Sequence, residues 1–339
     1  MTAHAVRHPA QPDRPTDIPA PGWWAALRRA FTQFSHDDIT DRAAALTYFG
    51  ILAIFPGLLV LVSILGFLGK NTSQKFLDNV SQIAPGGVRT FLQSVIEQVQ
   101  GRQGAASIAA AVGLLLAIWS ASGYVAAFMR ATNAIYDIDE GRPIWRTAPV
   151  RLGITLATML GLVITALMVV LTGSVARQVG RAIGVGNAGV TAWDIAKWPV
   201  LLIIVSMMLS LLYWASPNAK QDGPIWVTPG GVIAVIAWLV ASGAFAVYVS
   251  FSGSYNKTYG SLATVIVFLV WLWITNIAIL LGAEVNAELQ HQRMITAGVP
   301  EDVEPFVELR DTRKLDDDEK ARVERAAQQR AQALSQDGR

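Results

Sequence analysis

Six stretches of this chain contain no Asp, Glu, Lys or Arg, and each is long enough to cross a bilayer as a helix. They are residues 43–69, 103–129, 152–176, 198–219, 223–256 and 258–283. A helix rises about 1.5 Å per residue, so roughly 18–20 apolar residues span the roughly 30 Å of hydrocarbon. Helices in the cores of soluble proteins rarely run this far without a charge. The series therefore predicts an all-α, polytopic membrane protein with six transmembrane helices.

The composition agrees with this interpretation. Hydrophobic residues make up 53% of the 339 residues and charged residues only 15%, where soluble domains have about 25% charged residues. The chain has no cysteine, which excludes disulfides and thiolate metal sites. Its net charge of +2 is too small to indicate a nucleic acid partner. We therefore expect the lipid bilayer as its surroundings.

The chain divides into a membrane domain and two flanking segments. The domain covers residues 37–292, with spans at about 43–69, 105–128, 152–172, 198–215, 229–250 and 261–283. Residues 1–22 are polar and proline-rich, so we expect them to be disordered, and residues 23–36 predict an amphipathic helix in the headgroup region. Residues 70–102 predict an extramembrane amphipathic helical hairpin. The polar segment 293–339 predicts a solvated helix or a disordered tail.

Arginine positions predict the orientation of the chain in the membrane. An even number of spans puts both termini on one side. Arginines are dense near the span ends, at residues 28, 29 and 42 and in the loop 130–151. Because positive residues favour the cytoplasmic side, we expect both termini there, although the opposite side also has basic residues in longer segments.

Four blocks of sequence resemble the YihY/BrkB family of bacterial inner-membrane proteins. They are AAALTYFGILAIFPGLLVLVSILG (43–66), WSASG with the following RATNAIYDI (130–138), SPN (216–218), and SYNKTYGSLATVIVFLVWLWITNIAILLGAEVNAEL (254–288). The resemblance covers roughly residues 35–292 and implies a six-helix inner-membrane protein with cytoplasmic termini. It does not imply one activity. Members have been labelled transporters, serum-resistance factors and ribonuclease BN, the last label being regarded as a misassignment.

The sequence offers little for catalysis. Its four histidines, at positions 4, 8, 36 and 291, are widely spaced and have no metal-ligand spacing. In HDDITD, the side chains of Asp37, Asp38 and Asp41 could in principle hold magnesium, but we favour a role in capping the first helix. We expect no enzyme activity, and no catalytic, cofactor or metal residues.

Twelve residues are candidates for functional or structural roles. They are Tyr48, Pro56, Arg130, Asn133, Tyr136, Tyr255, Asn256, Lys257, Tyr259, Gly260, Asn276 and Glu284. Pro56 should kink the first span, with Tyr48 facing the bundle. SYNKTYGS predicts an ordered turn at the membrane surface, whose Asn256 and Lys257 either face a solute entrance or only hold the turn. The amide of Asn276, at membrane depth, needs hydrogen-bonding partners.

Glu284 and Glu288 stand at the end of the last charge-free stretch. A glutamate at a helix C-terminus opposes the macrodipole, so we expect the last helix to continue through about Gln290. If Glu284 is partly buried there, it should pair with Arg130 or, second, with Arg42, as a clamp or gate at the cytoplasmic end. The alternative is a solvated acid at the interface, which contributes little.

Two classes of function follow from these observations. The first is a transporter or permeation pathway for a small or lipidic solute, since no charged residue lies inside a span. The second is a non-catalytic structural or envelope-resistance protein of the membrane. Ribonuclease activity is disfavoured. A homo-oligomer is compatible with either class, and the sequence does not name a substrate.

Overall fold

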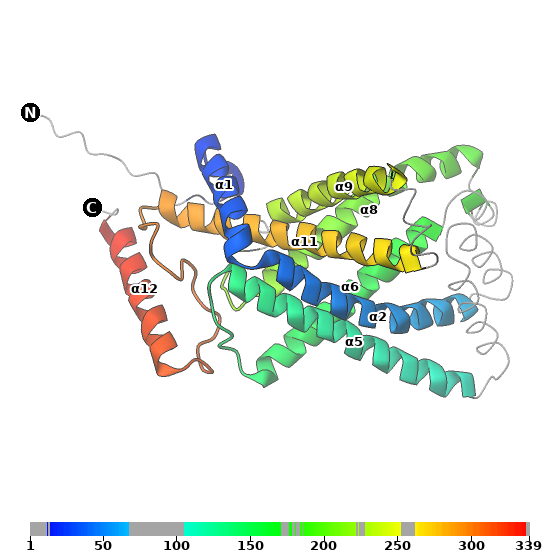
Figure 1. Ribbon diagram of the computed structural model, residues 1–339, viewed down its shortest axis with the longest axis horizontal. Helices are drawn as coiled ribbons and strands as arrows, with labels where there is room; N and C mark the ends of the chain where they lie inside the picture. Colours follow the sequence, from blue (N-terminus) through cyan, green and yellow to red (C-terminus); the bar gives the residue numbers. More distant parts are fainter. Residues whose placement is uncertain are drawn as a thin grey trace, which may run out of the picture. The chain divides into compact units, whose positions relative to one another are not determined.

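The computed structural model describes residues 12, 14–67, 105–170, 176, 177, 180, 184, 186–221, 223, 228–251 and 262–336. This part of the chain is all-α, as predicted. After a 3₁₀ turn at Pro15–Asp17, its helices are α1 (Ala20–His36), α2 (Ile39–Phe67), α5 (Ala105–Ile135), α6 (Ile144–Val170), α8 (Asn187–Ala215), α9 (Thr228–Phe251), α11 (Leu262–Thr296) and α12 (Asp317–Gln336) (Figure 1).

Among the described residues, five helices are long and apolar enough to cross a membrane. They are Val112–Ile135, Ile144–Val169, Asn187–Ala215, Thr228–Phe251 and Val265–Thr296. Each overlaps one of the last five predicted spans. The first predicted span coincides with α2, whose side chains after residue 53 lie outside the description. The count of six spans therefore stays a prediction, and the predicted hairpin at 70–102 lies outside the described residues.

Two helices begin earlier than the charge pattern predicted. α6 starts at residue 144 rather than 152, and α8 starts at 187 rather than 198. In α8 the extra turns include Asp194 and Lys197, which form an ion pair of 2.8 Å. Pairing lowers the cost of keeping both charges in the helix, and Lys197 is only 2% exposed.

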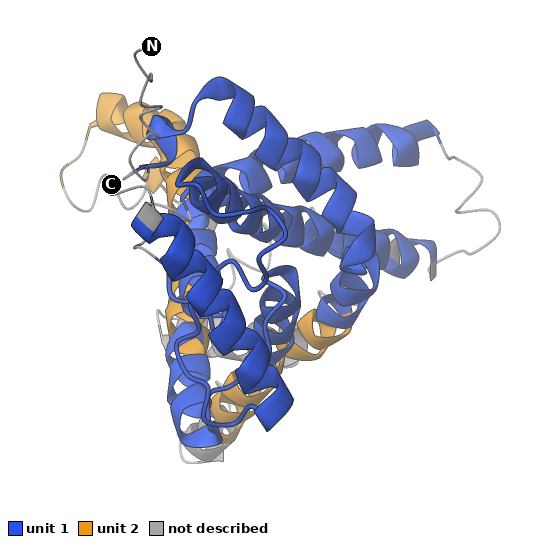
Figure 2. Cartoon of the chain, turned by 90° about the vertical axis from the view of Figure 1, so that its left-hand side faces the viewer, with its two compact units in different colours: residues 1–47, 126–154, 205–339 blue, residues 48–125, 155–204 orange. Residues whose placement is uncertain are grey.

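The chain forms two compact units (Figure 2). Unit 1 comprises residues 1–47, 126–154 and 205–339, and unit 2 comprises residues 48–125 and 155–204. Unit 1 thus contains α1, α9, α11 and α12 with the adjoining ends of α2, α5, α6 and α8. The side chains that form the candidate site described below belong to unit 1.

Helices α9 and α11 run side by side in unit 1 (Figure 1) and approach closely at two glycines. A Cβ atom added at Gly230 would overlap the carbonyl oxygen of Gly282. Small residues at such a crossing are typical of helix pairs in membranes. The Gly230 N–H donates to Asn286 Oδ1 at 2.8 Å, and the Trp238 indole N–H donates to Thr275 Oγ1 at 3.1 Å. Hydrogen bonds that involve polar side chains thus join α9 and α11 at two points along their length.

Helix α1 packs against α11. Its Ala26 and Ala30 are fully buried and form a core cluster with Val285 and Leu289 of α11. Trp23 and Leu27 of α1 also pack against this cluster, whereas Phe31 of the same helix is 68% exposed. The helix predicted at 23–36 is therefore present, and its location in the headgroup region stays a prediction.

The segment after α11 is folded, and of the two predicted alternatives, a solvated helix or a disordered tail, the structure contains the helix. The segment's buried apolar side chains include Val303, Phe306, Val307, Leu309 and Leu315. Leu309 forms an isolated antiparallel bridge with Ala219, in the loop after α8. The segment then leads into α12, whose Ala326 packs on Val299 and Val303. α12 is the predicted helix, with one side buried.

Candidate functional site

Helix α11 brings two glutamates inside unit 1. The helix runs past Gly282 to Thr296, which confirms that it does not stop at the end of the apolar stretch. Glu284 is 1% exposed and Glu288 is 5% exposed. The alternative of solvated interfacial acids is therefore wrong, and both carboxyl groups need partners.

The partner of Glu284 is another acid. Its carboxyl group is hydrogen-bonded to the carboxyl group of Asp37, just after α1, and its Oε2 atom has no hydrogen-bond partner among the described residues. Among the residues that the structure describes, no arginine forms an ion pair with Glu284, so the expected pair with Arg130 or Arg42 is not formed. A hydrogen bond between two carboxyl groups requires a shared proton, because two bare carboxylates repel each other.

The arginine of this region pairs one turn further along α11. Arg29 of α1 donates from Nε to Glu288 Oε2 at 2.6 Å, and its Nη2 donates to Gln292 Oε1 at 2.9 Å. His291 Nδ1 lies 3.7 Å from the same carboxylate. A buried carboxylate with a guanidinium partner thus joins α1 to α11, and sequence spacing did not reveal this pair.

Asp37 lies at the junction of α1 and α2, outside the spans. Burial raises the pKa of the Asp37 carboxyl group above its ordinary value, although the neighbouring His36 and Arg42 act in the opposite direction. Arg42 donates from Nε to the main-chain carbonyl oxygen of Asp37 at 2.7 Å. The junction is therefore held by Arg42, while the Asp37 side chain faces Glu284.

Asn133, at the end of α5, holds two loops together. Its Oδ1 accepts the Asn218 main-chain N–H at 2.8 Å, and its Nδ2 donates to Glu140 Oε2 at 3.1 Å. Arg142 pairs with Glu140 at 2.6 Å and also donates to the Ser216 carbonyl oxygen at 2.7 Å. Burial alone would raise the pKa of Glu140, but hydrogen bonds from Arg142 hold it below the ordinary value. This network joins SPN (216–218) to the segment that contains Asn133.

Tyr136 belongs to the same layer. It is 2% exposed, its hydroxyl oxygen accepts Gln221 Nε2 at 3.2 Å, and its ring lies 5.9 Å from that of Phe306. The C-terminal segment thereby covers the end of α5. Asn133 and Tyr136 both have structural contacts, and Asn133 also lines the cavity described next.

A cavity of about 390 Å³ opens beside these networks. Its lining residues come from the α1–α2 junction, the end of α5 and the α5–α6 loop: His36, Asp37, Arg42, Arg130, Asn133, Ala134, Asp137, Ile138, Asp139 and Glu140. The volume falls within the range of small-molecule sites. Arg130 is exposed here rather than buried against Glu284. Both signs of charge meet in one cavity at the ends of apolar helices.

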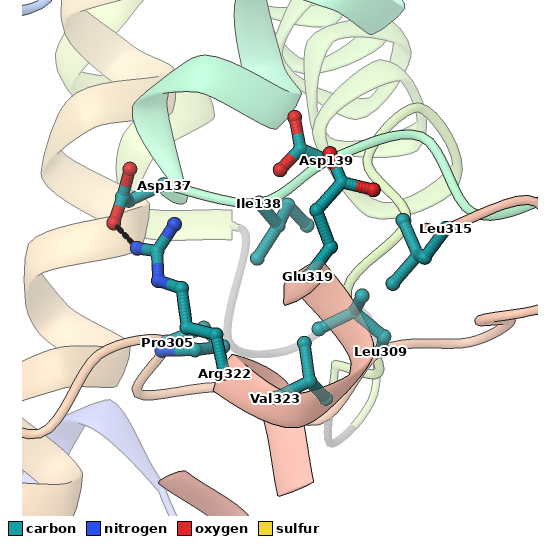
Figure 3. Close-up of a pocket in the computed structure, with 9 residues that line it drawn as sticks. All are labelled: Asp137, Ile138, Asp139, Pro305, Leu309, Leu315, Glu319, Arg322 and Val323. Carbon is teal, nitrogen blue, oxygen red and sulfur yellow. Dashed lines mark hydrogen bonds and ion pairs between the residues drawn. The ribbon is translucent and has the colours of Figure 1, made fainter. Parts of the chain in front are cut away.

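A second, much smaller pocket lies between the α5–α6 loop and the C-terminal segment (Figure 3). Its volume of about 10 Å³ has room for roughly one water molecule. Arg322 of α12 forms an ion pair with Asp137 across it. The pocket is therefore a packing interface, and it ties α12 to a loop that also lines the large cavity.

The remaining candidates have different surroundings. Asn276 is 1% exposed and donates to Thr47 Oγ1 at 3.0 Å, so its amide has the partner it needs. Tyr48 is 60% exposed, and the prediction that it packs inside the bundle is wrong. Its ring contacts Phe49 edge to face. The kink at Pro56 falls on side chains outside the description. The surface turn with Tyr255, Asn256, Lys257, Tyr259 and Gly260 lies outside the described residues as well.

In the described part of the chain, no group of three or more His, Asp or Glu side chains is arranged to hold a metal ion. The functional groups that line the large cavity are two guanidinium groups, an imidazole, carboxylates and an amide. Such groups bind polar and charged ligands through hydrogen bonds and ion pairs.

Comparison with known proteins places the chain among membrane proteins. The virulence factor BrkB family matches residues 30–304. The ribonuclease-like protein YfkH of Bacillus subtilis is 28% identical over 267 residues, which cover 79% of this chain and 95% of YfkH. A UPF0761 membrane protein of Vibrio campbellii is 28% identical over 283 residues, covering 79% of this chain and 83% of that protein. No solved structure matches.

Proposed function

The chain belongs to the virulence factor BrkB family, and from this premise we propose that it is a multi-pass protein of the bacterial inner membrane that provides a pathway for a small or lipidic solute. The cavity of about 390 Å³ supports this proposal. Guanidinium groups and carboxylates from three segments surround this open space, where they can contact a bound solute. A binding site for a polar group needs such a lining.

Reconstitution tests the pathway directly. The purified full chain is placed in liposomes with a fluorescently labelled phospholipid or with a panel of trapped small solutes. We expect movement of at least one of them above the rate in protein-free liposomes, and a lower rate for Arg130→Gln than for the exposed-site variant Arg325→Gln. Rates equal to those of empty liposomes for every lipid and solute would reject the proposal.

A second candidate is a non-catalytic role in envelope structure. The folded C-terminal segment favours it, because Arg322 and Arg310 bind the loops after α5 and α8, and Arg330 binds α12 to the segment. On this alternative, deletion of the segment impairs envelope resistance while liposome rates stay at background. We propose no enzyme activity for either candidate, and purified protein incubated with RNA should leave it intact.

The orientation is part of the proposal. Both termini and the loop 130–151 lie in the cytoplasm, as the arginine density favours. The chain has no cysteine, so single cysteines at Ser81 and Ser335 give clean labelling sites. In intact cells an impermeant maleimide should label the cysteine at 81 and not the one at 335. The reverse pattern would invert the orientation.

A further inference from the structure

Three of the four acidic side chains that line the large cavity are already matched within unit 1. Asp137 pairs with Arg322, Glu140 pairs with Arg142, and Asp37 is hydrogen-bonded to Glu284. The fourth acid, Asp139, is exposed, and only its main-chain carbonyl oxygen is engaged, by Asn218 Nδ2 at 3.1 Å. Its carboxylate has no partner among the residues that the structure describes. One carboxylate is thus free for a ligand.

Two guanidinium groups in the same cavity are also available. Within the described part of the chain, the exposed Arg130 side chain makes no ion pair or hydrogen bond. Arg42 uses Nε to bind the Asp37 carbonyl oxygen at 2.7 Å, and its terminal nitrogens have no partner among these residues. A guanidinium offers a planar fork of N–H donors that matches the oxygens of a phosphate group. The cavity therefore presents two such forks and one free carboxylate.

The sequence positions of Arg42 and Arg130 indicate how deep in the bilayer this site lies. Arg42 directly precedes the charge-free stretch 43–69, and Arg130 directly follows the charge-free stretch 103–129. Both cations therefore stand where hydrocarbon gives way to water. Phospholipid phosphate groups occupy the same level, and basic residues there interact with them.

We propose that the cavity binds an amine-bearing phosphate ester, with the phosphate on Arg42 and Arg130 and the ammonium group on Asp139. This inference rests on the proposed function and names the substrate class of the same cavity. A ligand with both charges satisfies all three groups. A phosphate ester without an amine leaves the Asp139 carboxylate unpaired beside a second anion. An aminophospholipid headgroup and a soluble phosphoethanolamine share the required chemistry.

Binding is measured on the full chain in detergent micelles, where no transport takes place. The probes are a short-chain phosphatidylethanolamine, the phosphatidylglycerol with the same acyl chains, and O-phosphoethanolamine. Microscale thermophoresis should show at least roughly fivefold tighter binding of the ethanolamine lipid than of the glycerol lipid. Displacement by equimolar O-phosphoethanolamine identifies a soluble headgroup as sufficient, whereas displacement only at a hundredfold excess identifies the lipid as the ligand.

Two variants separate the contributions of phosphate and amine. Arg130→Gln should weaken the binding of both lipids by about tenfold, because each loses the same phosphate contact. Asp139→Asn should tighten the binding of the glycerol lipid, because the repelling carboxylate is gone, and should remove the preference for the ethanolamine lipid. Arg325→Gln and Asp302→Asn replace exposed residues outside the cavity lining and should bind like the unmodified chain. If Arg130→Gln does not fold, Arg130→Lys takes its place. Lysine keeps the positive charge but lacks the planar N–H donors of the guanidinium, so a smaller loss of lipid affinity is expected.

The inference is overturned if none of the three probes binds, if the two lipids bind equally to the unmodified chain, or if Arg130→Gln and Asp139→Asn bind like their controls. Its failure is distinguishable from failure of the proposed function. Binding in micelles without movement in liposomes removes the pathway and keeps the site. Movement in liposomes without discrimination between the lipids in micelles keeps the pathway and rejects the amine-specific site.

Discussion

At the scale of single residues, the contact between Asp37 and Glu284 is the most unusual feature of unit 1. Two carboxyl groups that touch in a buried site ionise one after the other, as a pair. When such a pair loses its first proton, the remaining proton forms a hydrogen bond between the two groups. When it loses the second proton, two carboxylates remain and repel each other. Glu284 Oε2 has no hydrogen-bond partner in the part of the chain that the structure describes, so the pair depends on its shared proton.

We predict that Asp37→Asn makes the stability of the protein less dependent on pH. Burial raises the pKa of the Asp37 carboxyl group above its ordinary value in the folded chain. A carboxyl group with a raised pKa contributes stability that is complete below its ordinary pKa and is lost as the pH rises. The side-chain amide that this substitution introduces can donate to Glu284 without a shared proton. At about pH 8.5 the variant should therefore unfold about 2–4 °C above the unmodified chain in detergent.

The matched control for this experiment is Asp38→Asn. Asp38 is exposed and has a φ of 50°, a conformation that asparagine adopts readily, so its unfolding curve should follow that of the unmodified chain at every pH. The groups that face Asp37 are Glu284, His36 and Arg42, and none of them is changed. If Asp37→Asn and the unmodified chain lose stability in parallel between about pH 5 and 8.5, the proton is not shared.

The residue scale also shows what sequence could and could not predict. The cost of an acid at a helix end predicted that the helix continues past Glu284, and it does. The same argument predicted an arginine partner, because buried carboxylates are usually paired with cations. It could not identify Asp37, since the pairing depends on how α1 turns into α2. Arg29, far away in sequence, pairs with Glu288 instead.

At the scale of elements, the crossing of α9 and α11 depends on the absence of side chains at two positions. The main chains of the two helices touch at Gly230 and Gly282, and Asn286 accepts a main-chain N–H at the same level. Lipid tails are as apolar as the helix surfaces, so the association of such helices comes from close packing and from interhelical hydrogen bonds.

We predict that Gly230→Ala disrupts this pair. The added methyl group would overlap the Gly282 carbonyl oxygen and the Asn286 side-chain amide, so the helices must separate. Overpacking of this kind costs about 1–3 kcal/mol, and the melting temperature should fall by several degrees in a size-exclusion thermostability assay. Gly243→Ala, in the same helix, has open space around its Cβ and should melt within about 1 °C of the unmodified chain. Equal melting temperatures for the two variants would contradict the close crossing.

Charge-free stretches located the membrane helices well, because the cost of a charge in hydrocarbon acts on every residue of a span. They placed the starts of α6 and α8 too late, since helix ends outside the hydrocarbon accept charges, above all paired ones such as Asp194 and Lys197. The folded segment after α11 had no periodic pattern to reveal it. Its buried residues sit in an irregular chain that only tertiary contacts organise.

At the scale of the whole molecule, the C-terminal segment acts as a tie between the ends of membrane helices. Asn218 is fully buried after α8. Its Nδ2 donates to the Asp311 carbonyl oxygen at 2.9 Å, and its Oδ1 accepts the Asp311 N–H at 3.2 Å. The Arg310 main-chain N–H also donates to the Asn218 carbonyl oxygen, at 2.7 Å. Asn218, in the loop after α8, is thus joined by three hydrogen bonds to Arg310 and Asp311, in the segment that follows α11.

We predict that removing residues 299–339 lowers the stability of the chain through Asn218. Truncation leaves a buried amide without its Asp311 partners, and each buried polar group left unsatisfied costs about 1–3 kcal/mol. Asn218→Ala in the full chain removes the side-chain bonds on the other side of the same contact. Each change alone should lower the melting temperature in detergent by several degrees.

The combination of the two changes decides whether this contact carries the effect. Once the segment is absent, the Asn218 side chain has lost both bonds to Asp311; among the described residues it then keeps the bond of its Nδ2 to the Asp139 carbonyl oxygen, at 3.1 Å. The cost of Asn218→Ala in the truncated chain should therefore be well under half of its cost in the full chain, since contacting residues are not additive. A double-mutant cycle of melting temperatures measures this difference. Fully additive losses would show that the segment stabilises the protein elsewhere, through the pair of Arg322 with Asp137, for example.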